Sequence, residues 1–193
     1  MIFTNVAHAE RAARNGHPGF VVWFTGLSGA GKSTLAGGLE RLLFDRGYAP
    51  YVLDGDRLRS GLTRDLGFSL SDRSENIRRT GEVSKILADA GLIAIVALIS
   101  PMRVDRDQVR QSIPAGHFIE VFANSSLETC EKRDVKGLYL KARAGLIHEF
   151  TGITSPYETP LNPEIELRTD VMTVEDSLSR LVAELVRRKL LKS

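Results

Sequence analysis

Cysteine is almost absent from this chain, which has one, Cys130, among 193 residues. A single cysteine cannot form a disulfide within the chain and cannot supply a cysteine-rich zinc site. A lone thiol also fits a reducing compartment, so we expect a cytoplasmic protein. The segment from Met1 to Arg11 has no basic stretch followed by an apolar one, and we therefore expect no signal peptide.

Excess charge of one sign and long apolar runs are missing as well. The 26 basic residues are balanced by 24 acidic ones, and the formal net charge of +2 indicates no surface for nucleic acid. The longest apolar run, Leu92 to Ile99, is far too short to cross a bilayer. We expect neither nucleic acid nor a membrane as a partner. Because 42% of the residues are hydrophobic, the chain can bury a core, which predicts one domain over residues 1–193.

The most informative stretch, residues 26–33, matches the phosphate-loop pattern G-x-x-x-x-G-K-[ST] in full. It follows a strand-like apolar run and precedes apolar residues at helical spacing. Such a loop directs backbone N–H groups and a helix N-terminus at phosphates. We expect Lys32 to reach the β- and γ-phosphates of a nucleoside triphosphate and the Ser33 hydroxyl to bind Mg²⁺. The predicted nucleotide-binding residues of the loop are Gly26, Leu27, Ser28, Gly29, Ala30, Gly31, Lys32, Ser33 and Thr34.

Strand-like and helical patterns alternate along the chain. The expected strands are 20–25, 50–53, 92–99, 117–123 and 164–167, and the expected helices are 34–44, 71–90 with Ser71 as N-cap, 104–111, 125–134 and 174–191. This alternation predicts a three-layer α/β fold with a mostly parallel five-stranded sheet flanked by helices. Ligands of such folds bind at the carboxyl ends of strands, where Gly26, Asp54, Ser100 and Asn124 fall.

Residues 135–163 have weak apolar periodicity and are interrupted by glycine and proline. An ordinary long surface loop would give the same pattern. A lid is the favoured interpretation, because phosphoryl transfer needs water excluded and lids supply cationic and aromatic groups on closing. Including the end of the preceding helix, we predict a lid over about residues 131–163.

Two carboxylates and a guanidinium, Asp54, Asp56 and Arg59, follow the second expected strand. In small-molecule kinases one carboxylate holds Mg²⁺ and another accepts the proton of the attacking hydroxyl. We assign Asp54 with Ser33 to the metal and Asp56 to the base. A solvated turn with an N-capping aspartate is the structural alternative. A GTPase is excluded, because residues 124–127 replace the guanine-reading Asn-Lys-x-Asp after the fourth strand.

Six segments in order resemble the adenylylsulfate kinase (APS kinase) family. They are residues 24–34, residues 53–56 with Arg59, residues 67–68 with 72–79, residues 99–101, Asp134 with 136–139, and residues 150–158. The phosphate loop is generic, but the other segments are specific. The resemblance implies a P-loop kinase that transfers the γ-phosphate of ATP to the ribose 3′-hydroxyl of adenosine 5′-phosphosulfate (APS). The products would be 3′-phosphoadenosine 5′-phosphosulfate and ADP. This reaction is a step of sulfate assimilation.

The resemblance also implies an acceptor site. Forked donors suit the phosphosulfate, and the rings of Phe68 and Phe150 could clamp the adenine between two faces. The residues implied to bind the acceptor are Asp56, Arg59, Phe68, Arg73, Asn76, Ile99, Ser100, Lys136 and Phe150. On the ATP side, Arg133 resembles the guanidinium that stacks on the nucleotide base, and Thr169 begins the expected wall of the base pocket.

Ser100 matches a serine that the family describes as a phosphoserine intermediate. Direct in-line transfer needs no such intermediate, so we favour a hydrogen-bonding role and place Ser100 with Lys32 and Asp56 among the catalytic candidates. Two alternatives stay open: another small-molecule P-loop kinase, or a catalytically silent APS-binding regulatory domain, against which the intact Lys32 and Asp56 argue. A homodimer and a functional link to a separate ATP sulfurylase also stay open.

Overall fold

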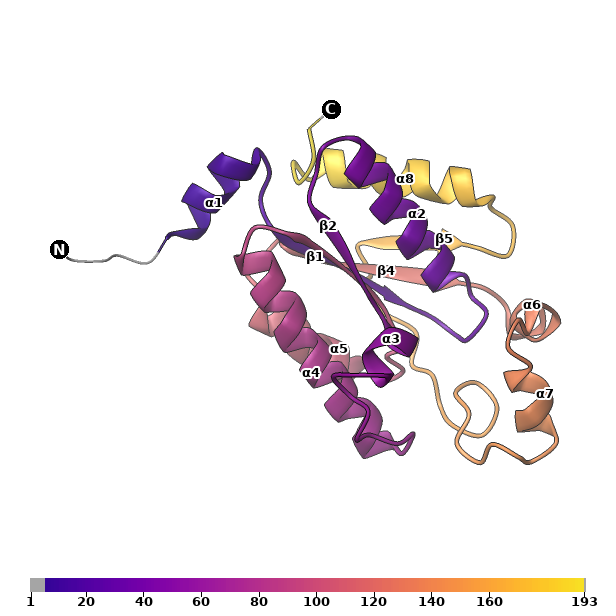
Figure 1. The fold of residues 1–193 in the computed structure, drawn as a ribbon. Helices are drawn as coiled ribbons and strands as arrows, with labels where there is room; N and C mark the ends of the chain where they lie inside the picture. The colour runs from indigo at the N-terminus through magenta and orange to yellow at the C-terminus, as the bar shows by residue number, and fades with distance from the viewer. Residues whose placement is uncertain (1–5, 193) are drawn as a thin grey trace.

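Five parallel strands form a sheet in the order β2-β3-β1-β4-β5 (Figure 1). The structure, a computed structural model, describes residues 6–192. The strands are β1 (Phe20–Thr25), β2 (Pro50–Asp54), β3 (Ile93–Ala97), β4 (Phe118–Asn124) and β5 (Ile165–Arg168). The helices are α1 (His8–Asn15), α2 (Lys32–Asp45), α3 (Gly55–Arg59), α4 (Leu70–Asp89), α5 (Arg103–Ser112), α6 (Leu127–Arg133), α7 (Leu138–Arg143) and α8 (Val174–Arg187). The predicted three-layer α/β architecture is confirmed.

Alternate side chains of β1 enter the two apolar layers of the core. Phe20, Val22 and Phe24 join the cluster formed with α2 and α8, whereas Val21 and Trp23 join the cluster formed with α4 and α5. Figure 1 shows these helix pairs on opposite faces of the sheet. Because both faces are covered, every residue of β1 and β3 is buried, and both strands are apolar throughout except for Thr25 at the end of β1.

The predicted lid region has a small apolar core of its own. Cys130, Tyr139 and Phe150 pack with Ala30 of the phosphate loop and Ala123 of β4. Helices α6 and α7 therefore form a compact extension against the carboxyl ends of the strands (Figure 1). No helix in the described part of the chain is long and apolar enough to span a membrane.

Two predicted helix boundaries are wrong. Helix α4 begins after Ser69 and not after Ser71, because the Ser69 hydroxyl accepts a hydrogen bond from the Asp72 N–H at 3.1 Å. Ser69 and Asp72 have the spacing of a capping box, which favours the earlier serine. Helix α8 ends at Arg187 and not at Leu191, because the backbone turns at Lys189 with a φ of 61°.

Three short helices, α1, α3 and α7, were not predicted. Helix α3 has five residues and is capped by Asp54, whose carboxylate accepts a hydrogen bond from the Asp56 N–H at 3.0 Å. The N-capping alternative for this cluster is therefore correct for Asp54. This capping role leaves the predicted metal-binding role of Asp54 possible, because its second carboxylate oxygen contacts Ser33 at the end of the phosphate loop.

Candidate active site

The phosphate loop joins β1 to α2, and its backbone requires glycine. At Gly26, φ is 147° and a Cβ atom would lie 2.5 Å from the Ala123 carbonyl oxygen. Gly31 has a φ of 90° and is the N-cap of α2, where no side chain caps the helix. The first N–H groups of α2 therefore have no capping acceptor and are available to an anion.

Lys32 is buried beneath the loop and donates hydrogen bonds to the carbonyl oxygens of Gly26 at 2.9 Å and Leu27 at 2.7 Å. Burial lowers the pKa of Lys32 to about 8, although the nearby Asp54 carboxylate opposes this shift. The ammonium group thus hydrogen-bonds to neutral carbonyl groups. A polyphosphate in the loop would supply the negative charge that these partners lack.

Ser33 and Asp54, the predicted metal pair, are in contact. The Ser33 hydroxyl donates a hydrogen bond of 2.7 Å to Asp54 Oδ2. Hydroxyl and carboxylate oxygens are ligands that Mg²⁺ uses, with phosphate oxygens and water completing the octahedron. No group of three or more His, Cys, Asp or Glu side chains suited to a metal occurs within residues 6–192. The donor set therefore fits a magnesium ion that arrives with a nucleotide.

Asp56, the predicted base, faces the lid. Its carboxylate forms an ion pair with Lys136, which lies between α6 and α7. Both side chains are largely exposed, so the pair adds little to stability. The contact nevertheless brings together a predicted base and a predicted acceptor-binding cation from segments far apart in the sequence.

Arg59 and Phe68 form the exposed part of the predicted acceptor site. The Arg59 guanidinium lies over the Phe68 ring, 4.2 Å from its centroid, and donates to the Gly67 carbonyl at 3.0 Å. The Phe68 ring is 60% exposed. An exposed aromatic ring backed by a guanidinium is a suitable platform for a flat base.

Arg73 and Asn76 lie on the adjoining turns of α4. Arg73 donates to the Phe68 carbonyl at 2.7 Å, to Thr151 Oγ1 at 2.6 Å and to the Glu149 carbonyl, and so links α4 to the lid. Asn76 is 5% exposed, and its Oδ1 atom has no hydrogen-bond partner within the described residues. A buried acceptor without a donor is costly, so Asn76 is suited to receive a hydrogen bond from a ligand.

Phe150 differs from Phe68, its predicted partner in the clamp. It is 7% exposed, and its ring packs edge-on against Tyr139 with centroids 4.9 Å apart. In this structure Phe150 therefore offers a ligand almost no free ring surface. The motif indicated an aromatic residue in the lid, but it carried no information on which side of the lid the ring lies.

Ser100 is 3% exposed and has a φ of 40°, in the left-handed region. Its Oγ atom accepts a hydrogen bond from Trp23 Nε1 at 3.1 Å. No carboxylate or imidazole contacts this Oγ atom in the part of the chain that the structure describes. A serine nucleophile needs a base within hydrogen-bond reach, so the geometry favours a positioning role. The neighbouring Ile99 is held by Thr25, whose hydroxyl donates to its carbonyl at 2.7 Å.

Arg133 and Thr169, predicted to lie on the nucleotide-base side, both contact the phosphate loop. Arg133 donates to the Gly29 carbonyl at 3.1 Å and to the Thr169 carbonyl at 2.5 Å. The Thr169 hydroxyl donates to the Ala30 carbonyl at 2.9 Å. The segment after β5 is thus joined to the phosphate loop, as a wall of a base pocket requires.

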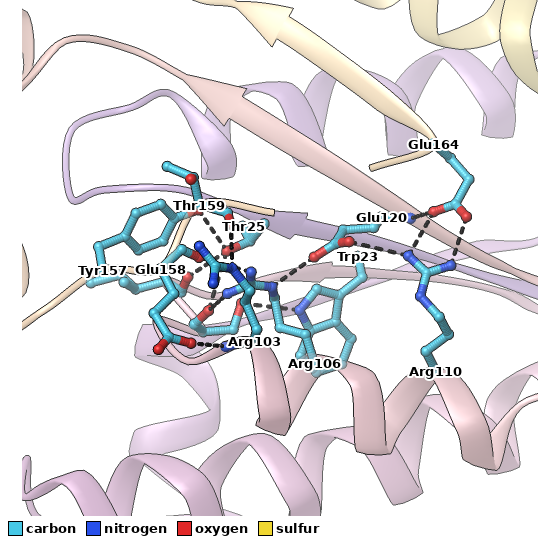
Figure 2. Close-up of polar contacts among 12 residues, drawn as sticks. Trp23, Thr25, Arg103, Arg106, Arg110, Glu120, Tyr157, Glu158, Thr159 and Glu164 are labelled. Atoms are coloured by element: carbon cyan, nitrogen blue, oxygen red, sulfur yellow. Dashed lines mark hydrogen bonds and ion pairs between the residues drawn. The ribbon is translucent and has the colours of Figure 1, made fainter. Parts of the chain in front are cut away.

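Two structural groups at the site were missed. The Tyr139 hydroxyl donates to the Ser28 carbonyl at 2.9 Å, and burial raises the pKa of Tyr139 above its usual range. Arg106 of α5 is buried against Glu120 of β4 (Figure 2). The sequence around Arg106 predicts only a polar helix. A local pattern cannot show that one arginine of such a helix is buried and contacts the loop after β3.

Together these features define a class of protein. A phosphate loop after the central strand of a parallel sheet, a hydroxyl–carboxylate pair beside it and a lysine from the segment between α6 and α7 are the parts of a small-molecule P-loop kinase. A family model described as adenylylsulphate kinase matches residues 18–168, well over half of the chain. The chain belongs to the adenylylsulfate kinase family.

Relatives agree along most of the chain. An adenylyl-sulfate kinase of Marinobacter nauticus is 57% identical over 97% of this chain and 94% of its own length. An adenylyl-sulfate kinase of Staphylococcus haemolyticus is 53% identical over 97% of this chain and 94% of its own length. The structure of the Mycobacterium tuberculosis APS kinase CysC in complex with AMPPNP and APS superimposes with a TM-score of 0.84 and 46% identity, covering 88% of this chain and 99% of that one. The chain is an ATP-dependent kinase.

We predict that Lys32→Met abolishes turnover and stabilises the ligand-free protein. The loss of the ammonium removes charge stabilisation of the transferred phosphoryl group, so kcat should fall at least about a hundredfold. Because burial in the folded protein lowers the pKa of Lys32 to about 8, its charge costs stability below that pH, and this cost fades as the pH rises toward the ordinary lysine pKa of 10.5. Thermal unfolding at pH 7 should therefore show a higher Tm for the variant. A lower Tm, or a near-normal kcat, would contradict this assignment.

Proposed function

We propose that the chain transfers the γ-phosphate of ATP to the ribose 3′-hydroxyl of adenosine 5′-phosphosulfate, giving 3′-phosphoadenosine 5′-phosphosulfate and ADP. One arrangement carries the proposal: the Ser33–Asp54 pair and the Asp56–Lys136 pair lie side by side, between the phosphate loop and the lid. A phosphoryl donor and a hydroxyl acceptor would meet between these pairs. The relative solved with both AMPPNP and APS supports the choice of the two substrates.

On the donor side, residues 26–34 would enclose the phosphates of ATP. The Lys32 ammonium would leave the Gly26 and Leu27 carbonyl groups for the β- and γ-phosphate oxygens. Ser33 and Asp54 would hold Mg²⁺, which when bound supplies charge neutralisation at the transferring phosphoryl group. Arg133 and Thr169 would enclose the base of ATP.

On the acceptor side, Asp56 would orient the 3′-hydroxyl and accept its proton. In the ligand-free protein the Asp56 carboxylate is paired with Lys136. The phosphosulfate anion competes for the same ammonium group, so acceptor binding would release the Asp56 carboxylate to act as a base. Arg59, Arg73 and Asn76 would bind the phosphosulfate and the nucleoside, alongside Ile99 and Ser100.

Phe68 would stack on the acceptor adenine, and Phe150 would approach from the lid. Of the two rings, only Phe68 is largely exposed. Phe150 would either turn away from Tyr139 to contact the adenine or support, by its packing, the residues that contact it. A homodimer, a link to a separate ATP sulfurylase and a cytoplasmic location stay predictions. Phosphorylation of a sugar or a plain nucleoside monophosphate in place of APS is the alternative activity.

We predict different defects for the two aspartates. Asp56→Asn keeps the shape of the side chain and removes the base, so kcat should fall by about two or more orders of magnitude with little change in ATP affinity. Asp54→Asn should raise the Mg²⁺ concentration needed for half-maximal rate. Both are measured by ADP release with APS present, over a magnesium titration. A larger kcat defect in Asp54→Asn, with no change in magnesium dependence, would reverse the two roles.

We predict that Phe68→Ala and Phe150→Ala each weaken acceptor binding by roughly 1–3 kcal/mol, the usual scale for one base–aromatic stack. Affinity for a non-hydrolysable ATP analogue should barely change. Because Phe150 is buried in the lid, its truncation should also lower Tm, whereas truncation of the exposed Phe68 should not. Calorimetric titration with APS and with the analogue separates the ligands. Equal losses for both ligands would mean that the rings support the fold and do not contact the acceptor.

A further inference from the structure

A buried ion pair lies behind the acceptor side of the site. Arg106 of α5 is 2% exposed, and its Nε atom donates to Glu120 Oε1 on β4 at 2.6 Å (Figure 2). Burying two charges carries a desolvation cost that their attraction offsets only when geometry and further hydrogen bonds are good. The pair therefore need not stabilise the fold. The other contacts of Arg106 indicate its role.

The other two nitrogen atoms of Arg106 each contact a different segment. Nη1 donates to the Ser100 carbonyl at 2.7 Å, and Nη2 donates to the Glu158 carbonyl at 2.8 Å. One planar guanidinium thus joins β4, the loop after β3 (residues 98–102, which we call the Ser100 loop) and residues 157–159. We call residues 157–159 the lid stem because they lie near the end of the predicted lid. A lysine ammonium could not reach all three acceptors in this fork geometry.

Both segments held by Arg106 are under constraint. Ser100 has a φ of 40°, in the left-handed region, and such a conformation of a non-glycine residue persists only where its surroundings impose it. Its carbonyl oxygen also lies 3.3 Å from the Thr25 hydroxyl, as the longer branch of a hydrogen bond that this hydroxyl shares with the Ile99 carbonyl. In the lid stem, the Glu158 N–H donates to the Pro101 carbonyl at 2.9 Å, and Tyr157 Oη lies 3.0 Å from Thr25 Oγ1. The Ser100 loop and the lid stem are therefore fixed to each other.

We propose that Arg106 is a positioning residue for acceptor use: it sets the Ser100 loop and the lid stem in one arrangement and thereby shapes the acceptor pocket. The proposal rests on the proposed function. The contacts on the ATP side run through Arg133, Thr169 and Tyr139, and none of them involves Arg106. A substitution of Arg106 should therefore change the KM for APS more than the KM for ATP.

Arg110 provides a matched control on the same helix. It donates to the second oxygen of Glu120 at 3.1 Å and to Glu164 at 2.6 and 2.9 Å, but it contacts neither Ser100 nor the lid stem (Figure 2). Since Arg110 continues to neutralise Glu120, a lysine at position 106 leaves no unpaired carboxylate in the core. Arg106→Lys and Arg110→Lys thus make the same chemical change to the two partners of one carboxylate.

The first test compares kinetic constants for the two substrates. In Arg106→Lys the KM for APS should rise about tenfold, the equivalent of one lost charge-assisted hydrogen bond, while the KM for ATP stays within about twofold. Arg110→Lys should leave both KM values within about twofold of wild type. Equal rises for the two substrates in Arg106→Lys, or the same APS effect in Arg110→Lys, would overturn the proposal.

A second test does not use activity. Hydrogen exchange of the backbone amides in residues 157–159 should be faster in Arg106→Lys than in wild type and unchanged in Arg110→Lys. If Arg106→Lys does not fold, Glu120→Gln, which keeps an oxygen for Arg106 but removes the charge, should show the same change at smaller amplitude. Unchanged exchange in a folded variant would refute the positioning role. If the wild-type protein fails to phosphorylate APS, the proposed function is wrong. The difference in hydrogen exchange between Arg106→Lys and Arg110→Lys still tests whether Arg106 positions the lid stem.

Discussion

The parallel register of the strands determines where the chemistry of this protein lies. Ala97 near the end of β3 is the register partner of both Phe24 on β1 and Asp54 on β2. The three strands therefore end within a residue or two of one another, at the same edge of the sheet. The phosphate loop, the Asp54–Asp56 turn and the Ser100 loop leave from these ends. Each is a short loop on a rigid support, which is how this fold class builds its sites.

Several groups at this edge are left without the partners they need. Lys32 is buried against neutral carbonyls, and among residues 6–192 no side chain caps the first turn of α2 and no donor reaches Asn76 Oδ1. Phosphate oxygens of a bound nucleotide would pair with Lys32 and with the first N–H groups of α2. A bound acceptor would supply a donor to Asn76 Oδ1. The protein thus gives up stability at positions where a ligand can restore it. By contrast, Arg106 and Glu120 are fully engaged, as expected of a pair that positions other groups.

Much of this arrangement could be predicted from local sequence. The alternation of strand and helix patterns and the phosphate-loop motif led to the sheet, its parallel direction and the Ser33–Asp54 pair. Each pattern is local, and the carboxyl ends of parallel strands meet at one edge of the sheet. Motifs led to the position of Lys136 beside Asp56. The burial of Phe150, the contacts of Arg106 and the three short helices could not be predicted in this way. They depend on packing between segments far apart in sequence, such as Phe150 against Tyr139 or Arg106 against Glu158, for which a single sequence carries no periodic signal.

The central claim is that the acceptor is an adenine nucleotide carrying a phosphosulfate. It is tested most directly by the mass of the product formed from APS and Mg-ATP, compared in parallel with a plain nucleoside monophosphate and a sugar acid as acceptors. We expect one added phosphate on APS, at the 3′-hydroxyl, with ADP released in equal amount and poor use of the other acceptors. Efficient phosphorylation of the nucleoside monophosphate or the sugar acid, with none of APS, would contradict it.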